Sequence, residues 1–327
     1  MTEDNYVNAV WKNLGNGCIY VKNDLHKSDI QNILKESSLS KVLLSSQTSS
    51  RTFEVLNEHL FSSRPDVWFQ PTALTDFKFL KLMTNIESLH IDNFQIKSFE
   101  GIDNLINLKR LILYDTKSKS ISLKPISNLT ELTYLYISGH KRDIESISGL
   151  NKINDLTLRS ITVENLNILR NFEQLEKLHV LLGGTKNYEA IIDLPKLRHF
   201  ELWHVQKLAD IEFISNLKRL EYLQISSLRN IVSLPKFTHN LHLVKLVLEN
   251  LKGLDDISTL RNLKNLEEFW FIGANNLTSE QFKVLQQCPK LKMASVGFGS
   301  EKKNNELQEF FETIGVKSYD YKKSIFQ

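Results

Sequence analysis

Three polar residues in the middle of the chain, His179, His199 and Glu201, are of types that could support acid–base or metal chemistry. Histidine titrates near neutral pH and is a common metal ligand, and a carboxylate can share a proton or an ion with it. If these residues belong to neighbouring parallel strands, His179 and Glu201 lie in one column about 4.8 Å apart, and His199 lies one column away. This spacing fixes no third ligand. We therefore expect a surface hydrogen bond here and no metal site.

No complete catalytic motif is found in the sequence. It has no HExxH, GxSxG or CxxC motif and no phosphate-binding loop. His140, Arg142 and Asp143 superficially resemble a kinase catalytic loop, but the Asn that should follow is missing. We predict a non-enzymatic protein without catalytic residues, cofactors or metals. An enzyme that uses the His179, His199 and Glu201 cluster is kept as a rival hypothesis.

A recurring apolar pattern must position these residues. Ten copies of LxxLxL, with aliphatic or aromatic substitutes, lie between Ile86 and Val296, and their first positions are 21 to 25 residues apart. A repeat of this length supplies one short strand per coil and buries its apolar edge only against its neighbours. Before Ile86 the pattern continues in degraded form as the pairs Ile19 and Val21, Val42 and Leu44, and Val67 and Phe69, with Val67 taken as the equivalent of Leu89.

This pattern resembles the leucine-rich repeat superfamily. The resemblance implies an α/β solenoid, or horseshoe, of about thirteen coils, with a parallel concave sheet and a mixed helical and irregular convex side. Many members place Asn three residues after the last strand leucine, whereas this chain has residues such as Phe94, Thr116 and His140 there. We predict an N-terminal cap over 1–17, repeats over 18–299, and a C-terminal cap helix and edge strand over 300–327.

The segments between the strands differ along the chain. Residues 27–36, 51–61 and 74–83 have apolar residues at helical spacing, which predicts helices. Later segments are shorter and end in Pro or Gly, which favours irregular or 3₁₀ crossings. Thr278 and Gln281 resemble a capping box that begins a helix, and Pro289 would end it.

Both ends of the solenoid need a cover. Near the C terminus, Leu307, Phe310, Phe311 and Ile314 follow the spacing of one helical face. At the N terminus, Tyr6, Val10 and Trp11 are candidates for a cap, and Gly15-Asn16-Gly17 equally suits a hairpin turn. The sequence does not separate these two possibilities.

Side chains between the inward leucines should line the concave face, because successive residues of a strand alternate between its two sides. The column between the last two apolar positions includes Trp68, His90 and Ile112. Large aromatic residues beside Arg are typical of protein interface hot spots, although they also simply suit a pleated surface. The predicted partner-binding residues are Trp68, Arg110, Ile112, Tyr114, Tyr134, Tyr136, Arg159, His179, His199, Glu201, Trp203, Tyr222 and Trp270.

Composition limits the classes of partner and compartment. The 41 basic and 38 acidic residues leave a net charge of +3, which is too small and dispersed for a nucleic-acid footprint. The first residues contain no uninterrupted apolar run, so we expect no secretory signal. No apolar run is long enough for a membrane span, so we expect no membrane association. Cys18 and Cys288 are the only cysteines, which favours a cytoplasmic protein with two free thiols. Enrichment in Asn, Lys and Ile favours a bacterial source.

These observations lead to a functional hypothesis. We expect a protein-binding module that grips a partner protein along its concave face, as a toxin-neutralising (immunity) protein, an inhibitor or an adaptor. A nucleic-acid binder that uses Lys and Tyr on the sheet is the other alternative, and it predicts steeply salt-dependent retention on polynucleotide. Fold alone does not identify the partner, and the oligomeric state stays open.

Overall fold

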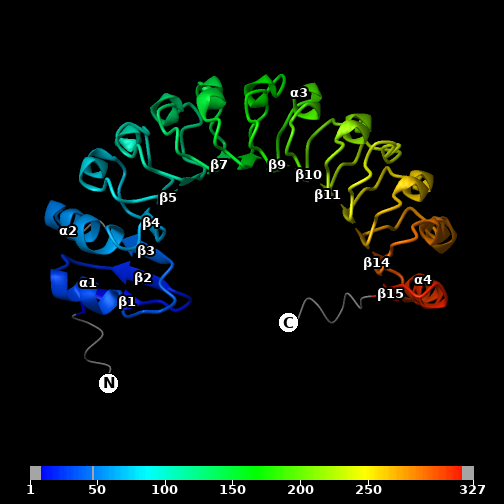
Figure 1. Ribbon diagram of the computed structural model, residues 1–327, viewed down its shortest axis with the longest axis horizontal. Coiled ribbons are helices and arrows are strands. Elements are labelled where there is room, and N and C mark those ends of the chain that lie inside the picture. The colour runs from blue at the N-terminus through cyan, green and yellow to red at the C-terminus, as the bar shows by residue number, and fades with distance from the viewer. Residues whose placement is uncertain (1–8, 46–47, 319–327) are drawn as a thin grey trace. The chain divides into compact units, whose positions relative to one another are not determined.

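The computed structural model describes residues 9–45 and 48–318, and the chain forms two compact units, residues 1–156 and 157–327. Each unit is a leucine-rich repeat solenoid, in which each coil pairs one short strand with one return segment. Within each unit the strands lie along one side and the helical return segments along the other (Figure 1). The structure confirms the repeat fold and its parallel sheet. The predicted divisions after residues 17 and 299 stay predictions.

The first unit contains seven complete strands and a series of helical return segments. The strands are β1 (Trp11–Asn13), β2 (Cys18–Val21), β3 (Lys41–Leu44), β4 (Trp68–Pro71), β5 (Ser88–Ile91), β6 (Arg110–Leu113) and β7 (Tyr134–Ser138). The return segments contain α1 (Lys27–Ile33), α2 (Ser50–Val55), the π-helix η2 (Leu56–Phe61), and the 3₁₀ helices η3 (Lys78–Leu82), η4 (Ile102–Asn104), η5 (Lys124–Ile126) and η6 (Ile144–Gly149). Strand β8 (Asp155–Arg159) contains the boundary between the units.

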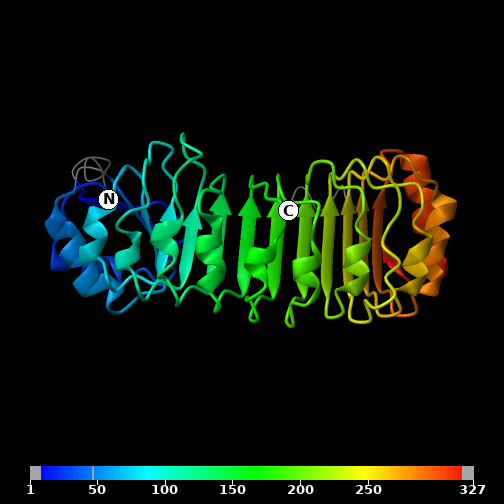
Figure 2. The ribbon, with the colours of Figure 1, turned by 90° about the horizontal axis from the view of Figure 1, so that it is seen from above.

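The second unit continues the same construction. Its strands are β9 (Lys177–Leu181), β10 (His199–Trp203), β11 (Tyr222–Ser226), β12 (Lys245–Glu249), β13 (Glu268–Ile272), β14 (Met293–Gly297) and β15 (Lys317–Ser318). Figure 2 shows that the arrows of its long strands point the same way. Its return segments contain α3 (Glu189–Ile192), α4 (Glu301–Thr313), and the 3₁₀ helices η7 (Asn167–Leu169), η8 (Glu212–Asn216), η9 (Ser258–Asn262) and η10 (Ser279–Gln287).

The core of each unit consists of the inward side chains of the pattern. Leu111 and Leu135 in the first unit, and Leu178 and Phe200 in the second, are fully buried and paired in register on adjacent strands. The residues between them face away from the return segments, on what we call the open face of the sheet. The sheet therefore separates the buried leucines from the side chains on the open face.

The chain ends are organised differently. At the N terminus β1 pairs antiparallel with β2, and Gly15, Asn16 and Gly17 form the turn with positive φ angles, so the hairpin is correct. Val10 and Trp11 are half-buried, whereas Tyr6 lies outside the described residues. At the C terminus α4 buries Leu307 and Phe311 and packs on η10, β14 and β15.

One predicted register is wrong by two residues. Phe69, and not Val67, pairs with both Val42 and Leu89. The return segment before β4 contains α2 followed directly by the π-helix η2, which uses more residues than the spacing of the earlier coil suggested. A shift of two keeps each side chain on its face but moves it one column. Trp68 therefore lies beside Ser88 and Arg110, and Gln70 takes the place beside His90.

The return helices agree with the expected change along the chain. The first two segments form α-helices, whereas the third segment expected to be helical, residues 74–83, contains the 3₁₀ helix η3. Most later segments are also 3₁₀ turns, with the four-residue α3 and the C-terminal α4 as exceptions. The capping box that opens η10 is present, with the Thr278 N–H donating to Gln281 Oε1 at 2.9 Å. Cys288, directly before Pro289, is its C-cap. Among the described residues, no helix has both the length and the apolar character needed to cross a membrane.

The two thiols should react at very different rates. Cys18 is half-buried, whereas Cys288 is 4% exposed and donates its S–H to the Leu260 carbonyl at 3.2 Å. Burial raises the pKa of Cys288 to about 11, so little thiolate forms near neutral pH. We expect a disulfide reagent to titrate Cys18 in the folded protein and both thiols after denaturation. Two rapidly reacting thiols in the folded protein would contradict the packing around Cys288.

Candidate functional site

An aromatic cluster lies on the open face of the first unit. It consists of Trp68, His90, Tyr114, Tyr134 and Tyr136, from the three strands β4, β5 and β7 and the residue that follows β6. The rings of His90 and Tyr114 stack with centroids 5.4 Å apart, and Tyr114 and Tyr136 lie 5.1 Å apart. Trp68 meets Tyr134 edge to face at 6.2 Å. The rings therefore form one continuous surface, of which Tyr114 is 37% exposed.

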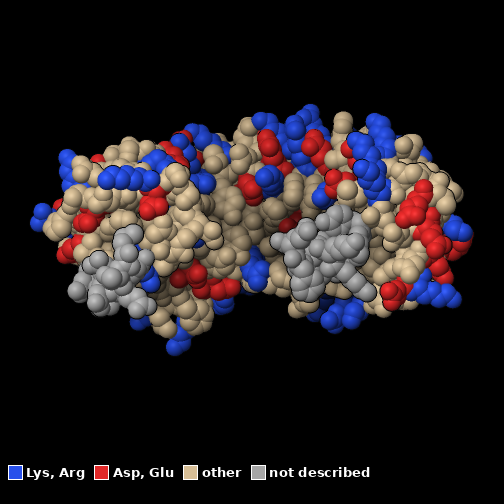
Figure 3. Space-filling model, turned by 90° about the horizontal axis from the view of Figure 1, so that it is seen from below, with Lys and Arg blue, Asp and Glu red and all other residues tan. Residues whose placement is uncertain are grey.

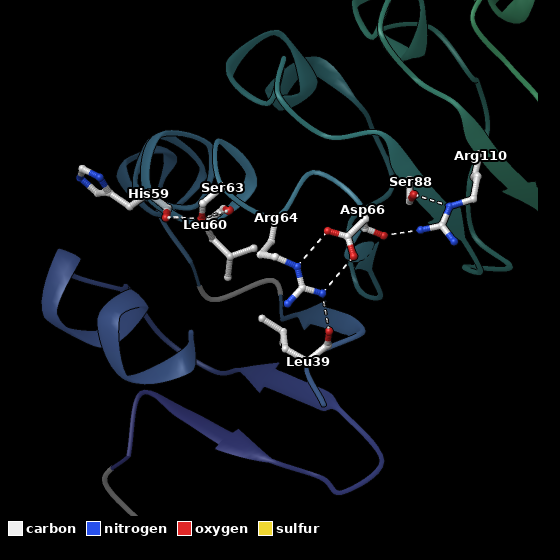
Figure 4. A network of polar contacts seen from close by, with 8 residues as sticks. All are labelled: Leu39, His59, Leu60, Ser63, Arg64, Asp66, Ser88 and Arg110. Carbon is white, nitrogen blue, oxygen red and sulfur yellow. Dashed lines mark hydrogen bonds and ion pairs between the residues drawn. The ribbon is translucent and has the colours of Figure 1, made fainter. Parts of the chain in front are cut away.

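Arg110 is held over this cluster by a polar network (Figure 4). Its guanidinium lies 4.6 Å from the Trp68 ring centroid, which is a cation–π distance. Its Nε donates to Ser88 Oγ at 2.7 Å, and its Nη2 donates to the Asp66 carbonyl. Arg64 in turn donates two hydrogen bonds to the Asp66 carboxylate, both 2.9 Å long, and lowers the pKa of that carboxyl. Arg110 is thus held in one position by its contacts within the chain, and a side chain ordered in this way would lose little further freedom in a contact with another molecule.

Burial changes the protonation of two members of the cluster. It lowers the pKa of His90 to about 4, with Lys41 nearby acting in the same direction, so the ring is neutral near pH 7. Burial also raises the pKa of Tyr134, which keeps its hydroxyl protonated as a hydrogen-bond donor. The buried Nε2 of His90 has no hydrogen-bond partner among the described residues. A partly buried surface of uncharged side chains is better suited to contacts with aromatic and amide groups than to contacts with charged groups.

A second cluster, the histidine cluster, lies on the open face of the second unit and consists of His179, His199, Glu201 and Tyr222. His179 Nδ1 lies 2.7 Å from Glu201 Oε2, which confirms the predicted pair. The side chains of these two residues are about 20% exposed, at 19% and 21%. His199 stacks on Tyr222 with centroids 4.0 Å apart and rings 13° from parallel. Burial, and then the nearby His179, lower the pKa of His199 to about 4.

Polar contacts fix Tyr222 in turn. Its hydroxyl donates to Gln224 Oε1 at 2.7 Å, and the Gln224 amide donates to Ser226 Oγ at 3.2 Å. All three residues belong to β11 and face the same side, because they are two positions apart. The chain of hydrogen bonds holds the Tyr222 ring upright against His199.

Two tryptophans on the same unit each lie under a cation. The Arg159 guanidinium is 5.4 Å from the Trp203 ring, and the Lys245 ammonium is 5.9 Å from the Trp270 ring. Lys245 also forms an ion pair at 2.8 Å with Glu268, its direct partner on the adjacent strand β13. Such partly exposed ion pairs contribute little to stability, so their main effect is to orient the lysine.

The structure places every predicted site residue on or at the edge of the open face, and their role in binding stays a prediction. Within the first unit Ile112 is half-buried beside His90 and Tyr136. His90 belongs to the aromatic cluster, Ser88 accepts a hydrogen bond from Arg110, and Gln224 accepts one from Tyr222. Sequence reasoning left these three residues out of the binding set. Their signal was available, since they occupy the same columns. Two surface hollows of the second unit lie at the strand ends and not on the open face, one of about 340 Å³ beside His204, Lys207 and Arg229.

His140 stands at the position where many leucine-rich repeat proteins have asparagine, and its side chain donates a hydrogen bond to a backbone carbonyl of the neighbouring coil. We expect it to make the first unit sensitive to acid. It is fully buried, and its Nε2 donates to the Tyr114 carbonyl at 3.0 Å. Burial lowers the pKa of His140, as it does that of His90, against the weaker opposite effects of the hydrogen bond to the Tyr114 carbonyl and of Asp115. Both rings are therefore neutral in the folded state and take up a proton near pH 6.5 only when unfolded.

We expect stability to be full above about pH 6.5 and to fall as the pH drops toward 4, because the unfolded state then binds more protons. After a discount for the exposed part of His90, the loss between pH 7 and pH 5 should be about 1 to 3 kcal/mol. Urea denaturation at several pH values measures it. His140→Asn keeps a donor for the Tyr114 carbonyl and should flatten the curve. An unchanged curve would show that His140 is not responsible.

Comparisons with known proteins support the fold. No protein-family model and no curated protein sequence matches the chain. Among solved structures it is similar to an internalin (inlF) from Listeria monocytogenes, with 19% identity, a TM-score of 0.54, and 93% of this chain and 86% of that chain covered. A chain of the mouse RP105/MD-1 complex matches with 15% identity and a TM-score of 0.58, over 91% of this chain and 57% of that one.

A chain of the Drosophila Toll–Spatzle complex matches with 13% identity and a TM-score of 0.57, and this protein spans 47% of its length. Identities this low carry information about architecture alone. The chain therefore has the leucine-rich repeat fold.

Proposed function

We propose that this leucine-rich repeat chain is a non-enzymatic protein-binding module and that its partner contacts the open face of the sheet. The observation that carries the proposal is the continuous aromatic surface of Trp68, Tyr114, Tyr134 and Tyr136 with Arg110 fixed above it. Aromatic rings bury a large area with little loss of side-chain freedom, and Trp, Tyr and Arg dominate interface hot spots. Two of the similar structures are protein complexes, Toll with Spatzle and RP105 with MD-1, and this agrees with the proposal.

The charge distribution favours a protein partner over nucleic acid. Figure 3 shows Lys and Arg side chains interspersed with Asp and Glu side chains on the visible face. Several cations of the open face are already paired, as Lys245 is with Glu268 and Arg110 is with the Trp68 ring. Binding to nucleic acid depends on cations that can neutralise phosphates and so release the counterions condensed on the nucleic acid. The proposal also keeps a cytoplasmic bacterial location and a role as an immunity protein, inhibitor or adaptor.

A paired measurement of binding and stability tests the proposal. Affinity capture from the source cell and mass spectrometry first identify a partner, which is then titrated against variants. Tyr136→Ala and Trp203→Ala should each weaken binding by roughly 2 kcal/mol, about thirtyfold, because each removes an anchor. Melting temperatures should stay near that of the parent protein, since both side chains project from the sheet.

Lys35→Ala on an exposed return segment serves as the control and should change neither quantity. If the two open-face variants bind the partner normally, the partner contacts another surface and the proposal fails. Early melting of the same variants would instead identify these rings as structural. Retention on polynucleotide that falls steeply with salt would favour the nucleic-acid alternative.

A further inference from the structure

The histidine cluster brings three potential metal ligands together. One ligand atom each from His179, His199 and Glu201 lies within 4.8 Å of the other two. Strand spacing alone predicted only the His179 and Glu201 pair, because the direction of the His199 ring depends on side-chain packing. This is the one group of three His, Cys, Asp or Glu residues with such geometry in residues 9–45 and 48–318.

The backbone holds these three residues as a rigid triangle. Glu201 and His179 are direct partners on β10 and β9, and His199 precedes Glu201 by two residues on the same face of β10. Adjacent strands are about 4.8 Å apart, and residues two apart on one strand are separated by about 6.6 Å. Side chains from such a triangle converge above the sheet. Sites built on strands are more precise than sites on loops.

Neighbouring groups orient the rings. His199 is sandwiched between Tyr222 at 4.0 Å and His179 at 5.0 Å. The hydrogen bond from Tyr222 to Gln224 fixes the outer ring of this stack. The cluster is half-buried, so it is sheltered from bulk water on the sheet side and open on the other. Three fixed ligands with an open fourth position is the arrangement of metal sites that exchange a ligand.

We infer that His179, His199 and Glu201 bind one divalent transition-metal ion of the Zn²⁺ class, and that its open position faces outward from the sheet. Two imidazoles and one carboxylate are a donor set that Zn²⁺ accepts, with bonds of about 2.0 to 2.2 Å. Ligand atoms around such an ion are roughly 3.3 Å apart, so modest side-chain rotation from the observed spacing completes the site. Lys177 on β9 lies directly opposite His199 on β10, and its positive charge keeps the affinity for a metal cation moderate.

This inference does not depend on the proposed binding function, and Zn²⁺ alone is the probe. Full-length protein is stripped with a chelator and titrated with ZnCl₂ by calorimetry and equilibrium dialysis. We expect one ion per chain with a dissociation constant on the order of micromolar. His199→Asn and Glu201→Gln should each weaken binding at least tenfold, whereas His242→Asn, an exposed histidine of the same unit, should leave it unchanged.

A spectroscopic measurement on the parent protein avoids reliance on the variants. Co²⁺ bound in place of Zn²⁺ should give visible absorption bands of four-coordinate intensity, and added Zn²⁺ should remove them. The inference is overturned if the stripped protein binds no Zn²⁺ at a large excess of the ion. It is equally overturned if His199→Asn and Glu201→Gln bind as the parent does, or if bound Co²⁺ shows only weak six-coordinate bands.

Discussion

Leu178→Asp should abolish stable folding of the second unit. Leu178 is fully buried in β9 and pairs with the equally buried Phe200 on β10. The substitution removes most of a core side chain and leaves an unpaired carboxylate between two coils, at a cost of about 4 kcal/mol or more. Natural domains have only about 5 to 15 kcal/mol of stability in total. Soluble yield and urea denaturation measure the loss.

The same substitution three residues further on provides the control. Leu181 ends β9 on the open face and is half-buried. Leu181→Asp can keep its carboxylate hydrated, so we expect a loss of about 1 kcal/mol at most. Equal losses at the two positions would show that β9 does not have one buried and one open side. The difference between them, more than either value, tests the register on which both clusters depend.

The strands could be predicted because the repeat encodes them twice, in its period and in the alternation of its last apolar pair. Leu178, Phe200 and Leu223 follow at one-coil intervals, and the structure pairs them in register and buries them fully. The predicted partnership of His179 with Glu201 follows from the same arithmetic. A residue is therefore assigned to the correct column only where the number of residues in the preceding coil has been predicted correctly.

Coil length was the point at which the prediction failed. Val42 and Phe69 are paired although α2 and η2 lie between them, and the sequence does not show that this return continues as a π-helix. Trp68 consequently lies in the column of Ser88 and Arg110, and not in the column of His90 as predicted. The error hid the cation–π contact that positions Arg110. Helical returns are where tertiary packing, and not local pattern, sets the number of residues.

Backbone conformation at the strand ends was also hidden. Ser160, Leu182, His204, Ser227 and Asn250 all adopt positive φ at the same position after their strands. Each donates its N–H to the carbonyl of the next strand, as His204 does to Ser226 at 2.9 Å. Glycine is the residue usually found in such a conformation. Among the positions that directly follow a strand of the second unit and have positive φ, only that after β13 is a glycine, Gly273. The gain of one inter-coil hydrogen bond offsets the local strain.

Gly183→Ala should be among the most damaging single-methyl changes in the second unit. Gly183 occupies the position where many leucine-rich repeat proteins place Asn, and here the neighbouring coil approaches its Cα directly. A Cβ at Gly183 would lie 2.3 Å from the Ile161 carbonyl oxygen and 2.7 Å from the Ile161 nitrogen. Both are backbone atoms, and Ile161 is itself 2% exposed, so neither side can move freely. We expect a loss of about 2 to 4 kcal/mol in urea denaturation.

Gly297→Ala is the matched control in the same unit. A Cβ at Gly297 meets no atom within 4 Å, and its backbone needs no positive φ. Alanine there reduces the freedom of the unfolded chain without new contacts, so stability should stay the same or rise by about 0.5 kcal/mol. If Gly183→Ala is as harmless as Gly297→Ala, the coils on either side of Gly183 are further apart than described. The close approach at Ile161 would then not explain why this position carries glycine where many leucine-rich repeat proteins carry asparagine.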